Sequence, residues 1–282
     1  MAKQTINIGS AANDGTGSTL RESFDITNDN FTELYSGTGG LFHKIEGTNF
    51  TGSLLIGHNT TGTLSSALNN TGIGIGALDA LTSGDSNVAI GRTAGGALSS
   101  GSSNIAIGHN ALKTEDTHGY NIAIGSSALK DQDAGADAYN VAIGHEAGQN
   151  VTTGVRNTLI GGEAGDALTT GIYNVAVGYA ALSTEDDSGF NTAIGYGALR
   201  SQNVSGSGNN VAVGKDAGVN VTTGVNNTII GALAGDALQT GSNNTLIGKN
   251  AAASAVDVSN EITFGDSNIT NVRIPSDSTL KI

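Results

Sequence analysis

A short block, in which one polar residue is followed by three largely apolar residues and a glycine, recurs thirteen times along the chain. Its commonest forms are NVAIG, NIAIG and NTLIG, and ten of the twelve spacings between copies are 17 residues while two are 19. A fixed short period indicates one structural unit stacked on itself. The copies start at Ser53, Asn70, Asn87, Asn104, Asn121, Asn140, Asn157, Asn174, Asn191, Asn210, Asn227, Asn244 and Glu261.

Numbering each block from its first residue shows which positions are restricted. Position 2 is β-branched in all copies but one, position 4 is Ile, Val or Phe, position 5 is always Gly, and position 8 is Ala from Ala77 to Ala251. Position 3 is mostly Ala and is never charged. Because successive residues of a strand point to opposite faces, this pattern predicts a strand that is apolar on both faces, as in a buried parallel sheet.

After each strand a run such as ALSSG or NVTTG predicts a second, shorter strand that ends in a glycine turn. Seventeen residues are too few for a strand, a helix and a strand, so we expect an all-β fold: a parallel β-solenoid or β-roll of about 13 coils. At the usual strand spacing the rod would be roughly 60 Å long. Asn at one corner of successive coils predicts a ladder in which each amide satisfies the next.

A longer period of 70 residues lies above the short one. Residues 87–156 match residues 157–226, and TEDT at 114–117 returns as TEDD at 184–187. This super-repeat indicates duplication of a four-coil unit, so the length of the rod should be easy to vary.

Composition narrows the function classes. The net charge is -13 and the 12 basic residues are scattered singly, so no basic stripe for nucleic acid is present. The chain has no cysteine, which excludes disulfides and thiolate metal sites. No stretch approaches 18 apolar residues, so we expect no membrane span, and MAKQTINIGS lacks the apolar run of a signal peptide.

No combination of residues predicts catalysis, so we expect no enzyme, no catalytic or metal site and no cofactor. His58, His109 and His145 follow the glycine in non-adjacent coils and are expected on the surface. Acidic turns at 115–116, 131–137 and 185–187 could hold Ca²⁺, but they lack the EF-hand spacing, so solvated turns are favoured. Tyr179, Tyr196 and Lys215 occupy position 6 of three consecutive coils, where they could contact a glycan or form a stabilising ladder.

The N-x-A-I-G-x-x-A pattern of residues 53–265 resembles the head repeats of trimeric autotransporter adhesins, although those heads repeat at about 14 residues. The resemblance implies a left-handed parallel β-roll that assembles as a homotrimer. The residues favour the same assembly, because a coil this small cannot bury both faces of its strand and a long exposed apolar face promotes aggregation.

Residues 1–35 resemble the N-terminal module of tailed-bacteriophage fibre proteins. QTINIG predicts a short strand, Thr19 and Glu22 form a capping box, and Leu20, Phe24, Phe31 and Leu34 follow at heptad spacing, which suits a trimeric seam. We therefore expect a virion-attachment module at 1–35, a Gly-rich linker at 36–52, the solenoid at 53–265 and a C-terminal β segment at 266–282.

Together these features predict a structural protein of a phage virion, made in the host cytoplasm: a homotrimeric tail fibre or similar appendage. Its expected partners are other tail or baseplate proteins and a glycan or protein of the host cell surface. A bacterial surface adhesin of the autotransporter type and a polysaccharide-binding solenoid remain alternatives.

Overall fold

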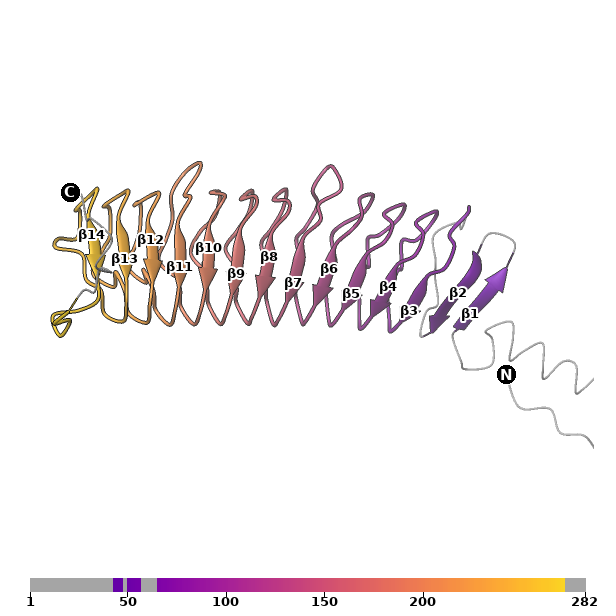
Figure 1. The fold of residues 1–282 in the computed structure, drawn as a ribbon. Helices are drawn as coiled ribbons and strands as arrows, with labels where there is room; N and C mark the ends of the chain where they lie inside the picture. The colour runs from indigo at the N-terminus through magenta and orange to yellow at the C-terminus, as the bar shows by residue number, and fades with distance from the viewer. Residues whose placement is uncertain (1–42, 48–49, 57–64, 272–282) are drawn as a thin grey trace, which may run out of the picture.

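The computed structural model describes residues 43–47, 50–56 and 65–271, and Figure 1 shows them as a rod of strands stacked in chain order. The expected N-terminal module at 1–35, most of the linker and the last residues of the chain lie outside these ranges. The strands are β1 (His43–Gly47), β2 (Phe50–Ile56), β3 (Thr71–Ile73), β4 (Val88–Ile90), β5 (Ile105–Ile107), β6 (Ile122–Ile124), β7 (Val141–Ile143), β8 (Thr158–Ile160), β9 (Val175–Val177), β10 (Thr192–Ile194), β11 (Val211–Val213), β12 (Thr228–Ile230), β13 (Thr245–Ile247) and β14 (Ile262–Phe264).

One sheet contains all 14 strands in sequence order. β1 pairs with β2 antiparallel, and the 13 strands from β2 to β14 are parallel and make about 12 turns. Equivalent positions pair in register even across a 19-residue coil, where Ala193 lies opposite Ala212. The parallel β-solenoid predicted from the repeat is therefore confirmed, and the described residues contain no helix.

The two 19-residue coils absorb their additional residues in turns. The connections between β6 and β7 and between β10 and β11 extend further from the rod than the others, on the same side (Figure 1). Because the insertions lie outside the strands, the strand register continues without interruption.

Each strand turns one face inward and the other outward. Position 3, for example Ala106, is fully buried, whereas the β-branched residues at positions 2 and 4 are half-buried or exposed. Ala at position 8 and large apolar residues at positions 9 and 12, such as Leu112 and Leu98, complete the inner core. The core is thus a narrow column that runs the length of the rod.

The prediction of a second strand in each coil, in runs such as ALSSG, is wrong. The segment after position 5 forms turns, because residues such as Thr93 (φ 55°) and Gly95 (φ 54°) adopt left-handed backbone that an extended strand does not contain. Its amide groups still bond to the next coil, as in Leu78 N–H to Ala94 O at 3.1 Å. The coils are therefore joined on this side by turn-to-turn hydrogen bonds and not by a second sheet.

The invariant glycine at position 5 has a steric cause. Gly91 has φ of 133°, and a Cβ placed on it would lie 2.6 Å from the carbonyl oxygen of Gly108 in the next coil. Any side chain here would push the coils apart.

The asparagine corner forms a continuous ladder. From Asn70 to Asn244 every position-1 Asn is buried, and its Oδ1 accepts the backbone N–H of the position-1 residue one coil later, which is Glu261 for Asn244. The predicted ladder is therefore built mainly of bonds from side chain to main chain and not from amide to amide. Asn157 shows the pattern: its Oδ1 accepts from Asn174 N at 2.9 Å, and its Nδ2 donates to Gly171 O at 2.9 Å. Each amide therefore satisfies main-chain groups that no strand partner reaches.

Candidate functional site

The outer face of the sheet is an apolar stripe along the rod. Its position-4 residues leave more than a third of their surface exposed in many coils; Ile90, Ile143, Ile160, Ile194 and Ile230 are 37% to 39% exposed. Position 2 adds Val, Ile or Thr beside them. The stripe is continuous because the strands are stacked in register.

The structure brings together the three residues that the sequence offered for glycan contact. The rings of Tyr179 and Tyr196 stack with centroids 5.7 Å apart, and the Lys215 ammonium lies 5.7 Å from the Tyr196 centroid. Gly162 occupies the same position one coil earlier, and a Cβ built on it would lie 3.3 Å from Tyr179 Cδ2. A hydrogen bond to the Glu163 carboxylate raises the pKa of Tyr179. Both tyrosine side chains remain about half exposed, at 48% and 47%, so they can offer ring edges and hydroxyl groups to a ligand.

A second aromatic row, which the sequence reasoning missed, precedes the Asn of five consecutive coils. Tyr120 stacks on Tyr139 at 4.9 Å, Tyr173 stacks on Phe190 at 5.2 Å, and Arg156 lies between the pairs and donates to the Tyr173 hydroxyl at 2.7 Å. All five have positive φ, and the four rings are 43% to 49% exposed. The signal was present in the sequence, because large planar residues recur at one fixed position.

The seam residues Leu20, Phe24, Phe31 and Leu34, which were predicted for attachment and trimerisation, lie outside the described residues. His58 lies outside them too. His109 and His145 are exposed, and the closest carboxylate to His145 is that of Glu146, with Nε2 to Oε1 at 3.6 Å.

Position 12 of the coil, a buried core position, carries a polar side chain in two pairs of adjacent coils. The first pair is Glu115 and Gln132, and the coil before it has Leu98 at this position. The second pair is Glu185 and Gln202, and the coil before it has Leu168. All four polar residues are fully buried. A buried carboxylate in place of leucine is costly unless its oxygens are satisfied, so these two glutamates need partners.

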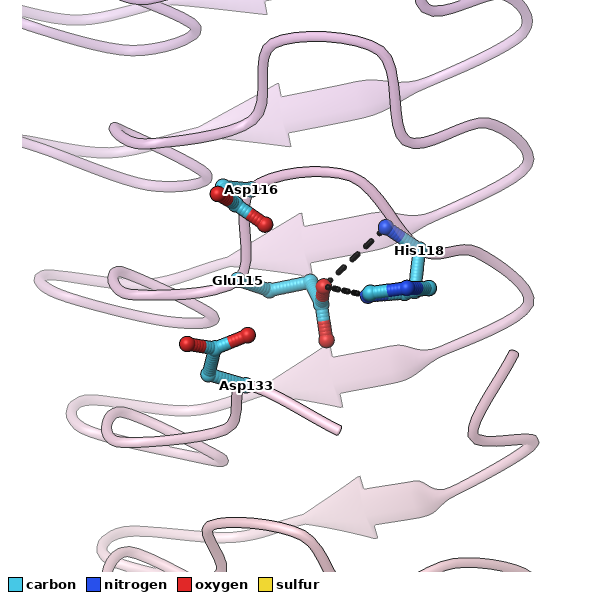
Figure 2. Close-up of side chains that lie close together, drawn as sticks. All are labelled: Glu115, Asp116, His118 and Asp133. Carbon is cyan, nitrogen blue, oxygen red and sulfur yellow. Dashed lines mark hydrogen bonds and ion pairs between the residues drawn. The ribbon is translucent and has the colours of Figure 1, made fainter. Parts of the chain in front are cut away.

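The first of these glutamates lies within a group of potential metal ligands. Figure 2 shows Glu115 between Asp116, His118 and Asp133, with Asp133 contributed by the next coil. One potential ligand atom of each lies within 4.8 Å of those of the others. Glu115 Oε1 accepts from His118 N at 3.1 Å and lies 3.2 Å from His118 Nδ1, whereas Glu115 Oε2 is buried with no hydrogen-bond partner. Burial raises the pKa of Glu115. The hydrogen bonds and charge of His118, and a weaker contribution from the backbone N–H of Ala134, only partly oppose this increase.

The three acidic turns considered for Ca²⁺ differ in whether their carboxylates lie close together. Residues 115–118 meet Asp133 as described, and Glu185, Asp186 and Asp187 form a second group. Asp131 instead pairs with Lys130 at 3.3 Å, and Asp137 accepts the Gly119 N–H at 3.0 Å. The segment 131–137 is therefore not a site by itself.

The fold and these surface rows define a repeat protein of the parallel β-solenoid class. No family model, curated protein or solved structure matches the chain. Among the described residues, no helix is long and apolar enough to cross a membrane.

Proposed function

We propose that this chain is the rod-forming subunit of a homotrimeric appendage, a tail fibre or similar structure of a phage virion that projects toward a host surface. The observation that carries the proposal is the outer face of the sheet. Ile160 and its equivalents place an exposed or half-buried Ile, Val or Phe in every described coil, so the rod presents one uninterrupted apolar stripe. Burying such a stripe against two further copies removes it from water.

The two aromatic rows support the proposal because they border the stripe along the chain. Tyr179 and Tyr196 follow their strands, whereas Tyr139 and Tyr173 precede theirs. Aromatic residues are enriched in protein interfaces, since they bury a large area at low cost in side-chain entropy. A strand flanked by aromatic rows is thus better suited to association than the strand alone.

The virion assignment rests on the resemblance of residues 1–35 to phage fibre modules. Stacked coils provide what such an appendage needs, a rigid spacer whose length changes by whole coils. Where the two aromatic rows stay exposed in the assembly, they favour contact with a surface glycan through hydroxyl groups and ring edges, so polysaccharide binding is the second candidate function.

Sedimentation equilibrium of the full chain tests the trimer. We expect about three times the chain mass of 28.0 kDa. Ile160→Asp, which places a charge on the stripe, should shift the equilibrium toward monomer. Thr170→Asp is the matched control, because it adds the same charge to an exposed turn of the same coil, and the next coil carries Asp187 at the equivalent position.

A well-folded wild-type monomer at micromolar concentration would refute the trimer. Equal effects of the two substitutions would show that the strand face is not the interface. Electron microscopy of particles labelled with an antibody to residues 1–35 then tests the attachment end separately.

A further inference from the structure

Among the described residues, two buried carboxylate oxygens have no hydrogen-bond partner, Glu115 Oε2 and Asp166 Oδ1, and only Glu115 is fully buried. Glu115 occupies the position that Leu98 fills one coil earlier and is fully buried. Its Oε1 faces the backbone and ring nitrogens of His118, but its Oε2 has no hydrogen-bond partner. Gln132, the buried amide of the next coil, donates its Nε2 to Thr152 O at 3.0 Å and makes no hydrogen bond to this oxygen.

The second copy of the 70-residue unit shows the same glutamate fully satisfied. Glu185 Oε1 accepts from Ser188 N at 2.9 Å, and Glu185 Oε2 accepts from Gln202 Nε2 at 3.1 Å. This copy keeps Asp186 at the position of Asp116 but lacks two of the other ligands, because Ser188 stands where the first copy has His118 and Asn203 stands where it has Asp133. The orphaned oxygen, the imidazole and the additional carboxylate therefore occur together in one copy and are absent together from the other.

We propose that Glu115, His118 and Asp133, with Asp116 beside them, bind one divalent transition-metal cation of the Zn²⁺ type. The set offers one imidazole nitrogen and up to three carboxylate oxygens, which suits Zn²⁺ and its neighbours. Ca²⁺ prefers six to eight oxygen ligands and gains little from an imidazole.

The geometry needs only a small contraction. The potential ligand atoms lie within 4.8 Å of one another. Around a tetrahedral ion with bonds of about 2 Å, ligand atoms end roughly 3.3 Å apart. Asp116 and Asp133 are exposed and His118 is partly exposed, so these three side chains can close on the fixed Glu115. Because Asp133 comes from the next coil, the cation would tie two coils together at the start of the longer turn of a 19-residue coil.

Isothermal titration calorimetry of the full chain with ZnCl₂ tests the site, with CaCl₂ and MgCl₂ as parallel titrations. We expect one saturable Zn²⁺ site per chain and no comparable Ca²⁺ or Mg²⁺ binding. His118→Ser and Asp133→Asn should each weaken Zn²⁺ binding at least tenfold. Both install the residue that the second copy already carries, so the fold is expected to persist, as circular dichroism would check.

A pair of double variants separates the site from general negative charge. Asp116→Asn with Asp133→Asn removes two carboxylates from the proposed site, whereas Asp186→Asn with Asp187→Asn removes two from the equivalent turn of the second copy. Only the first pair should weaken binding. Absence of saturable Zn²⁺ binding, unchanged binding by His118→Ser, equal losses in the two double variants or tighter binding of Ca²⁺ would each overturn the proposal.

Discussion

Replacing one asparagine of the ladder by alanine should destabilise the rod far more than the loss of a small polar side chain usually does. Asn157 lies in the middle of the described coils and is fully buried. Asn157→Ala removes the Oδ1 that accepts from Asn174 N and the Nδ2 that donates to Gly171 O. Both main-chain groups would then be left without these partners between packed coils.

The expected magnitude follows from those two groups. A buried donor or acceptor that loses its partner costs about 1 to 3 kcal/mol, so two of them together cost about 2 to 6 kcal/mol. Asn157→Asp is informative beside it, because an aspartate keeps an acceptor for Asn174 but places a second oxygen against the Gly171 carbonyl. We expect it to destabilise as well, which would show that the donating half of the amide matters.

Urea unfolding followed by circular dichroism measures the global effect, and hydrogen exchange of the peptide around Asn174 measures the local one. Asn150→Ala is the matched control, since Asn150 is exposed in the coil before. Surface substitutions usually change stability by less than about 0.5 kcal/mol. If Asn157→Ala costs no more than Asn150→Ala, and the Asn174 amide exchanges no faster, the ladder does not hold the corner together.

Two further predictions address charge and register. Burial, followed by repulsion from the Glu163 and Glu146 carboxylates, raises the pKa of Asp166 from its ordinary value of 3.8 to about 6. A raised carboxyl pKa stabilises the fold below pH 3.8 and loses that contribution as the pH rises to about 6, so Asp166→Asn should stabilise the protein more at pH 7 than at pH 4 in thermal unfolding. The control is Asp236→Asn, at the equivalent position 70 residues later, where Leu233 stands in place of Glu163. Its effect on stability should differ less between pH 7 and pH 4, and an equal difference would contradict the role given to the surroundings of Asp166. Deleting residues 157–226 should leave a folded rod about 19 Å shorter in electron micrographs, because Asn227 can then donate its N–H to Asn140 as Asn157 does now. Deleting only residues 157–166 should disrupt the stack, because it shifts the later coils out of register. If both deletions cause an equal loss of folding, the proposed coil register is refuted.

The strand register and the ladder could be predicted from the sequence because both follow from strict spacing. Gly at position 5 and Asn at position 1 recur in almost every coil, and one repeated constraint defines all coils at once. The second strand could not be predicted in this way. Runs such as NVTTG have strand-like composition, but left-handed residues in the preceding turn, such as Glu146 (φ 57°) and Gly148 (φ 58°), curve the backbone away from an extended form.

The polar core positions and the second aromatic row were harder to predict, because both depend on the coil geometry. Glu115 and Glu185 resemble ordinary surface charges of an acidic turn until position 12 is known to face the core. Likewise Tyr120 and Phe190 attract no attention singly, and only the stacking of coils places them in one row. Tyr179, Tyr196 and Lys215 could be grouped beforehand because they occupy the same position in three consecutive coils.

The area of the outer stripe bears on whether the aromatic rows can serve both a trimer interface and glycan binding. A three-residue strand is about 10 Å long, and the twelve such strands from β3 to β14 stack at about 4.8 Å, which gives a stripe of roughly 550 Å². That area is near the largest apolar patch that monomers usually tolerate, about 300 to 600 Å², and below the roughly 800 Å² that each partner buries in a standard interface. A stable trimer therefore needs the flanking rows that include Tyr179 and Tyr173 as part of its interface. In the proposed trimer, rings buried in this way would not be free to contact a glycan, so trimer formation and glycan binding would compete for the same rows. If Ile160→Asp separates the chains, the released monomers should expose these rings, and any glycan affinity that depends on them should rise as the assembly dissociates.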